Sequence, residues 1–142
     1  YRPEYPGYGI YKGKPAEAKL IADADLLYQY VITELKYKEE DVILLGRSIG
    51  SGPALHLAAK RKPGALVLMS SFTSVRAVAR DRVGVLGQYL IKDRFKNIKC
   101  ISEVESPTLL IHGRKDRTIP SKHSQSFMVK TIVIVLSAKA YL

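Results

Sequence analysis

Short apolar runs separated by helical patterns are the feature that most constrains the fold of this chain. Four such runs, rich in branched aliphatic residues, occupy 42–45, 65–69, 107–111 and 131–136. Each run is too short for a helix and does not alternate with polar residues, which is typical of parallel strands buried on both faces. Because helical patterns separate the runs, the sequence predicts an α/β fold with a mostly parallel sheet and helices on both faces.

The clearest helical pattern lies near the start of the chain. Apolar residues from Leu20 to Leu35 recur at i, i+3, i+4 and i+7, which predicts an amphipathic helix over 15–37 with Pro15 in its first turn. Other helical segments are expected at 51–60, across most of 73–99, where Gly84 and Gly87 argue against a continuous helix, and shortly after Pro120. No repeat or change in composition divides the chain, so residues 1–142 are expected to form a single domain.

The first strand runs directly into a G-x-S-x-G motif, Gly46-Arg47-Ser48-Ile49-Gly50, and a helix is predicted to follow it. At such a sharp turn the serine adopts a strained backbone conformation that exposes its hydroxyl as a nucleophile. Gly46 and Gly50 suit positions where the backbone passes too close to its neighbours for a Cβ. The Ile49 amide, at the helix start, is placed to donate to an oxyanion. The alternative is a glycine-rich turn that contains an incidental serine.

A serine nucleophile needs a base, and the base needs an orienting acid. Asp116 follows the apolar run 107–111, so in a parallel sheet it lies on the same edge as Ser48 and is the candidate acid. The alternative is a helix-capping or surface aspartate. Asp93 is a weaker candidate, because it lies in a stretch predicted to be helical and rich in charge, and we leave it out of the site.

Several motifs together resemble the α/β-hydrolase domain-containing protein 17 group, in register from Tyr1 to about Ser124. They are YPGYG at 5–9, ADA at 22–24, GRSIGSGPA at 46–54, SSFTS at 70–74 and PTLLIHG at 107–113, followed by Asp116. The resemblance implies a serine hydrolase, similar to acyl-protein thioesterases, that removes palmitate from cysteines of membrane-associated proteins. Close relatives are described as serine peptidase-like. The resemblance to the protein 17 group also implies that Ser48 is the nucleophile, that Asp116 is the triad acid and that no cofactor is needed.

The chain departs from that group at both ends. The family's catalytic histidine stands in a Gly-x-Gly-His-Asn-like loop after the last strand, but 137–142 contains no histidine. The family's first strands and second oxyanion-hole segment would precede Tyr1. We therefore expect an incomplete domain, without the N-terminal strands and the C-terminal histidine loop, that is inactive as given. His123 is the candidate substitute base, whereas His56 and His112 are expected to be structural. No spacing of histidine and carboxylate residues indicates a metal site.

The chain is basic, with 23 Lys and Arg against 13 Asp and Glu and a net charge of +10. These cations are scattered rather than gathered into a stripe, so they are interpreted as solvated surface and not as a nucleic-acid site. A basic face toward anionic lipid headgroups, and hence association with a membrane surface, is the alternative. The single Cys100 excludes an internal disulfide and fits a reducing compartment.

Two hypotheses about function follow. In the first, the chain is a serine hydrolase that cleaves the acyl ester or thioester of an acylated protein or small acyl ester through an acyl-enzyme on Ser48. In the second, it is a catalytically inactive fragment or pseudoenzyme that retains the fold as a binding module. A cytoplasmic location is expected, at the membrane face if segments outside this chain attach it there. The sequence indicates no particular oligomeric state.

Overall fold

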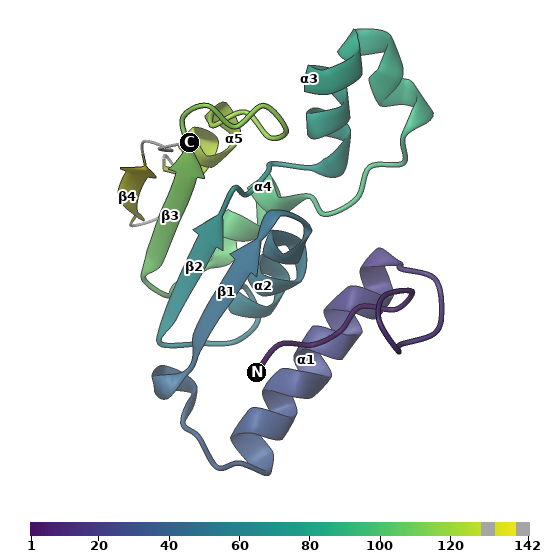
Figure 1. The fold of residues 1–142 in the computed structure, drawn as a ribbon. Coiled ribbons are helices and arrows are strands. Elements are labelled where there is room, and N and C mark those ends of the chain that lie inside the picture. The colour runs from purple at the N-terminus through teal and green to yellow at the C-terminus, as the bar shows by residue number, and fades with distance from the viewer. Residues whose placement is uncertain (129–132, 139–142) are drawn as a thin grey trace.

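The computed structural model describes residues 1–128 and 133–138, whose strands form one parallel sheet. Strands β1 (Ile43–Arg47), β2 (Ala65–Met69), β3 (Thr108–Gly113) and β4 (Val133–Ala138) lie in that order across the sheet (Figure 1). The prediction of an α/β fold with a parallel sheet is confirmed. The strands match the predicted runs within two residues at each end, except that residues 131 and 132 of the last run lie outside the described residues.

Helix α1 (Glu17–Thr33) precedes β1, and helices connect the consecutive strands that follow, as parallel pairing requires. The connecting helices are α2 (Ser51–Ala58), α3 (Val75–Gly87), α4 (Asn97–Cys100) and α5 (Lys122–Met128). Short 3-10 turns occupy Glu39–Asp41, Ser48–Gly50, Gln88–Leu90 and Ile101–Glu103.

Two helical predictions need correction at their ends. Helix α1 is shorter than the predicted 15–37, because Ala16 is its N-cap and the chain turns to a positive φ of 59° at Lys36. The predicted helical region 73–99 is broken, since Gly84 has a φ of 80° inside α3 and no helix covers 91–96. Asp93 therefore lies between helices rather than within one.

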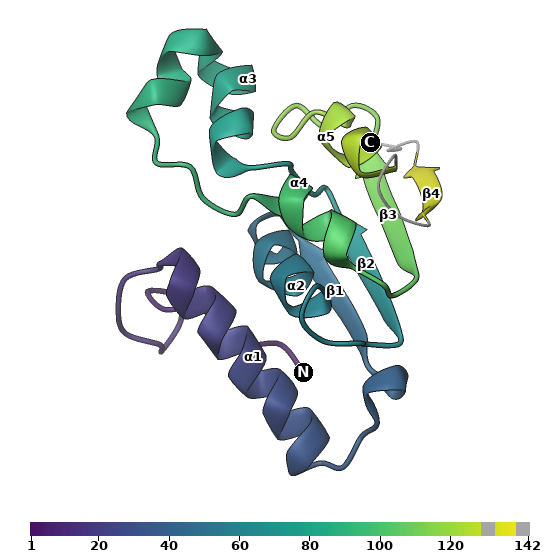
Figure 2. The ribbon, with the colours of Figure 1, turned by 180° about the vertical axis from the view of Figure 1, so that it is seen from behind.

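The main hydrophobic core lies between the sheet and the helices that cover one of its faces. Leu66, Leu68 and Leu110 from β2 and β3 are almost completely buried against Leu55 of α2 and Phe127 of α5. Viewed from behind, α2 and α4 lie in front of β1 and β2 (Figure 2). The helices that contribute to this core thus pack on one face, where the sequence predicted helices on both.

Strand β1 differs from the buried central strand that its apolar sequence predicted. Leu44 packs toward the core, but Ile43 and Leu45 on the opposite face are 66% and 63% exposed. In the described part of the chain β1 pairs with β2 alone and so forms an edge of the sheet. An all-apolar run shows that a strand suits burial on both faces, but it does not supply the layer that would bury it.

The two environments give a direct test of the packing. Replacing Leu68, which is fully buried, by Ala should lower the free energy of unfolding by about 2–5 kcal/mol, because the substitution leaves a cavity in the core. The same change at Leu45, which is 63% exposed on the neighbouring strand, should lower it by less than about 1 kcal/mol. Urea unfolding followed by circular dichroism measures both, and equal losses would contradict this assignment of the core.

Candidate functional site

The candidate nucleophile stands at the junction of β1 and α2. The strand ends at Arg47, a 3-10 turn covers Ser48–Gly50 and α2 begins at Ser51. Ser48 has a positive φ of 50°, which is uncommon for a residue with a side chain and costs about 1–3 kcal/mol of strain. The predicted strained serine between strand and helix is therefore present, and its role as nucleophile stays a prediction.

The glycine before the serine is required by space. A Cβ on Gly46 would lie 2.8 Å from the Ala54 Cβ, the Gly50 carbonyl oxygen and the Ser51 Cα. A Cβ on Gly50 would meet only the Tyr5 hydroxyl, at 3.1 Å, and a small movement of that side chain would relieve the contact. Gly46 is thus what allows α2 to start directly over the end of β1.

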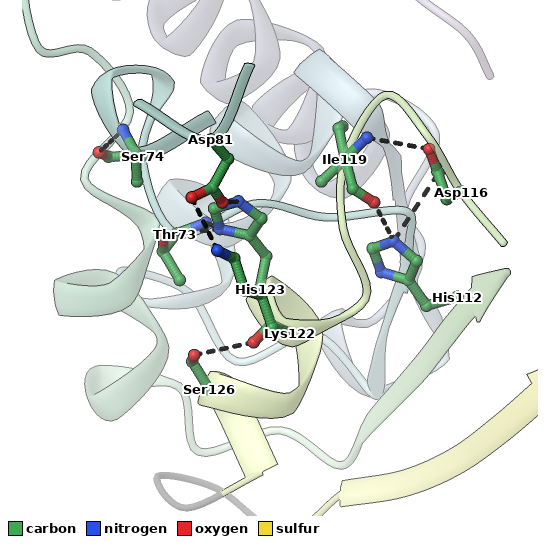
Figure 3. Close-up of polar contacts among 10 residues, drawn as sticks. Thr73, Ser74, Asp81, His112, Asp116, Ile119, Lys122, His123 and Ser126 are labelled. Atoms are coloured by element: carbon green, nitrogen blue, oxygen red, sulfur yellow. Dashed lines mark hydrogen bonds and ion pairs between the residues drawn. The ribbon is translucent and has the colours of Figure 1, made fainter. Parts of the chain in front are cut away.

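The candidate acid is held in a tight loop beyond β3. Asp116 Oδ1 accepts a hydrogen bond from the Thr118 backbone amide at 2.8 Å. It accepts a second from the Ile119 backbone amide at 2.9 Å, which Figure 3 shows. Burial by itself would raise the pKa of the Asp116 carboxyl, but the hydrogen bonds from Ile119, Thr118 and the Ser70 side chain outweigh it and lower the pKa. Asp116 is therefore an ionised carboxylate at neutral pH.

The parallel sheet brings Ser48 and Asp116 to one edge. Ser48 follows the carboxyl end of β1 and Asp116 lies three residues past the carboxyl end of β3, with β2 paired between the two strands. The prediction that both residues share an edge is confirmed, whereas a shared catalytic role stays a prediction.

Both ring nitrogens of His112 are in contact with other residues, one in the loop that carries Asp116 and one in α5. Nε2 lies 2.8 Å from the Ile119 carbonyl oxygen, to which it must donate, and Nδ1 lies 2.7 Å from the Ser124 hydroxyl. The ring is buried, and Nε2 is also 3.7 Å from Asp116 Oδ2. His112 is therefore structural, as predicted, because it joins the end of β3 to the Asp116 loop and to α5.

His123 is also occupied, so the structure does not support it as a substitute base for Ser48. Its Nδ1 accepts from the Thr73 amide at 3.3 Å and lies 2.9 Å from the Thr73 hydroxyl (Figure 3). Its Nε2 lies 3.0 Å from Asp81 Oδ2, although the two atoms are not aligned as a hydrogen bond and both are buried. Burial lowers the pKa of His123, and Asp81 offsets this only in part, so the ring is neutral at pH 7. The lone pair on Nδ1 is already used by Thr73.

His56 completes the set of three histidines in the chain. It lies half-buried near the end of α2, and burial together with the nearby Lys60 lowers its pKa. The placement agrees with the structural role expected of it. None of the three rings is thus placed by its contacts as the base of Ser48.

The partners of His123 could not be predicted from the sequence. Asp81 lies 42 residues before it in the chain, and Lys122 Nζ also binds Asp81, at 2.7 Å. These contacts tie α3 to α5, and no local pattern could have found them because they join segments that are far apart in the sequence. Asp93, left out of the site from sequence, accepts a long 3.4 Å hydrogen bond from the Arg76 amide at the start of α3.

A groove of about 580 Å³ runs along the free side of β1. It lies between α1 and β1 and reaches Arg47 and Gly50, but Ser48 does not line it. Within the described ranges, no group of three or more His, Cys, Asp or Glu side chains is arranged to hold a metal ion. None of the helices there combines the length and hydropathy that a bilayer crossing requires.

Sequence comparison relates the chain to one group of curated proteins. α/β-Hydrolase domain-containing protein 17B of Homo sapiens and of Xenopus laevis, and protein 17C of Mus musculus, are each 38% identical to it over 120 residues. The chain has part of the α/β-hydrolase fold and resembles the protein 17 group. The match covers 84% of this chain but 41% of human 17B, so the chain spans about two fifths of the length of these relatives. No protein-family model matches the chain.

Solved structures agree with this fold. An α/β hydrolase from Vibrio vulnificus superposes with a TM-score of 0.76 at 19% identity, covering 94% of this chain and 54% of that one. An esterase from Pyrococcus furiosus gives a TM-score of 0.71 at 15% identity, covering 95% and 60% of the two chains. At such low identities these superpositions show that the fold is shared and nothing further about function.

The contact at Gly46 gives a stability prediction. Replacing Gly46 by Ala should lower the free energy of unfolding by about 1–3 kcal/mol, because the added Cβ would overlap atoms of the helix that covers it. The matched control is Gly113→Ala at the end of β3, where an added Cβ meets nothing within 4 Å. Urea unfolding measures both variants, and a Gly46→Ala protein as stable as the control would contradict the close approach.

The lowered pKa of Asp116 predicts how stability responds to acid. Its folded-state pKa lies below the unfolded value of about 3.9, so its contribution to stability is complete well above that pH and is lost as pH falls through the lowered pKa. Asp116→Asn should therefore be less stable than the original chain at pH 7, and the difference should shrink toward pH ~2. Urea midpoints measured across this range test the prediction.

Asp41→Asn, which removes a carboxylate at an exposed position, controls for the change in net charge. A difference between the original chain and Asp116→Asn that stays constant with pH would contradict the proposed ionic interactions of Asp116.

Proposed function

We propose that this chain carries the nucleophile and acid of a serine hydrolase that cleaves acyl esters and thioesters. The observation that carries the proposal is the positive φ of Ser48 between β1 and α2, at a turn that only glycine at position 46 permits. A strained serine at this junction in a parallel sheet is the geometry of a nucleophile elbow. Asp116 supports it as a hydrogen-bonded carboxylate on the same edge of the sheet.

The reaction would proceed in two steps. The Ser48 hydroxyl oxygen attacks the acyl carbonyl carbon and gives its proton to a base, and the Ile49 amide stabilises the resulting oxyanion. The leaving alcohol or thiol departs with a proton, which leaves the acyl group on Ser48. Water then attacks this ester in the same way and releases the acid. Asp116 would orient the base and stabilise its protonated form.

Acylated cysteines of proteins are the proposed substrate. This finer proposal rests on the resemblance to the protein 17 group, which covers the Ser48 and Asp116 segments. The net charge of +10 is compatible with hydrolysis at a membrane surface that carries anionic lipid headgroups, where acylated proteins reside. Location at a cytoplasmic membrane face is part of the same proposal.

We do not propose a general base for Ser48 within this chain. His112 and His123 have both ring nitrogens in contact with other residues, and the chain has only three histidines. Loss of a triad member typically leaves about 10³–10⁴-fold catalysis over water. The second candidate function, a fold that binds acyl groups without turnover, is favoured by this occupation of the histidines.

Hydrolysis of p-nitrophenyl butyrate and of an acyl thioester tests both hypotheses, the serine hydrolase and the binding fold without turnover. The 142-residue chain should hydrolyse them no faster than its Ser48→Ala variant, because no base is available. A chimera that adds the flanking N-terminal strands and histidine loop of human protein 17B should regain turnover that Ser48→Ala and Asp116→Ala abolish.

The controls separate the hypotheses. A folded chimera whose activity survives Ser48→Ala would refute Ser48 as the nucleophile. Turnover by the 142-residue chain that is abolished by Ser48→Ala and also by His123→Ala would instead make His123 the base, against the contacts described above.

A further inference from the structure

A buried chain of hydrogen bonds ends on the carbonyl oxygen of Ser48. The Ser51 hydroxyl donates to this oxygen at 2.6 Å, and the Ser51 backbone amide donates to it as well. The Ser51 hydroxyl in turn accepts a 3.4 Å hydrogen bond from Asn97 Nδ2. Ser51 is fully buried and Asn97 is 1% exposed, so water does not compete with these contacts.

The Ser48 carbonyl shares one peptide plane with the Ile49 amide. In a trans peptide the C=O and the N–H point in opposite directions, and no described peptide bond is cis. When Ser51 holds the oxygen inward against α2, the Ile49 N–H must point away from α2. Hydrogen bonds to the carbonyl also polarise the peptide, which makes its N–H a stronger donor.

Asn97 is itself fixed from several sides. Its Nδ2 also donates to the Phe72 carbonyl oxygen, at 3.0 Å, on the loop after β2. Its backbone amide binds the carbonyl of Phe95, whose own amide donates to Glu17 Oε1 of α1 at 2.8 Å. The Phe95 ring packs so closely over Gly52 that a Cβ there would overlap it. One amide side chain thus links the elbow, the loop after β2 and the start of α4.

We infer that Ser51 and Asn97 are positioning residues that orient the Ile49 amide as the oxyanion donor. The inference rests on the proposed role of Ser48 as nucleophile. Neither side chain needs to touch the substrate, because both act through the Ser48–Ile49 peptide. Their loss should slow attack by Ser48 without weakening the initial binding of a reagent.

Labelling by a fluorophosphonate tests this inference on the chain as it stands, with imidazole in the buffer as the external base. In this reaction Ser48 Oγ bonds to phosphorus, fluoride leaves, the proton passes to imidazole, and the phosphoryl oxygen occupies the oxyanion position. Mass spectrometry gives the labelled fraction, and the dependence of rate on reagent concentration separates the maximal rate, kinact, from the binding constant, KI.

Ser51→Ala and Asn97→Ala should each lower kinact by about 10- to 100-fold, which is less than the 10²–10³-fold that loss of an oxyanion donor costs, because the Ile49 amide is misaligned rather than removed. KI and the final labelled fraction should stay unchanged. The double variant should lose little more than either single variant, because the two residues act in series.

Ser106→Ala is the matched control. Its hydroxyl is also buried and also donates to a carbonyl at 2.6 Å, that of Pro63, but at the opposite end of the sheet. It should leave kinact unchanged even if it lowers the melting temperature. A fall of kinact in Ser106→Ala equal to that in Ser51→Ala would show a general loss of stability and overturn the inference.

The failures are distinguishable. If the original chain is labelled no faster than Ser48→Ala, the proposed nucleophile is refuted and this inference falls with it. If labelling depends on Ser48 but Ser51→Ala and Asn97→Ala react at the original rate, the inference alone is overturned. A reduced labelled fraction at an unchanged kinact would likewise assign both residues a purely structural role.

Discussion

The close approach of α2 to the end of β1 is the constraint on which the rest of the site depends. The strand must turn into the helix within three residues, and the space around Gly46 leaves no room for a side chain. That turn forces Ser48 into a positive φ, where its strain is maintained by the packing of α2 on the core. The same turn presents the Ser48 carbonyl to Ser51, so backbone strain and the buried hydrogen bonds have one origin.

On the edge of the sheet that carries Ser48, the loop of the candidate acid is held mainly by hydrogen bonds to backbone groups and to short side chains. Asp116 is fixed by two amides of its own loop, and His112 secures that loop by donating to the Ile119 carbonyl. The Ser124 hydroxyl links His112 to Ser71 at the end of β2, with 3.0 Å between the two hydroxyls. These contacts hold the candidate acid on the same edge of the sheet as Ser48.

The histidines show why residue type and proximity in sequence do not identify a catalytic base. His123 follows Asp116 by seven residues, which made it the candidate substitute, yet its ring is buried between Thr73 and Asp81. Those partners come from the loop after β2 and from α3, so the fold uses His123 to tie α3 to α5. The low exposure that stabilises this contact also keeps the ring neutral.

By itself the sequence determined the parallel α/β fold, the strained turn at Ser48 and the position of Asp116, because each depends on local patterns: apolar runs, glycine spacing and the end of a strand. Only the tertiary structure decided which faces are covered, as Ile43 and Leu45 show by remaining exposed on an edge strand. It also decided the occupation of His123 and the contact of Asn97 with Ser51, 46 residues apart. Such contacts depend on where distant segments meet, and the physical rules that shape a strand or a turn act over a few residues only.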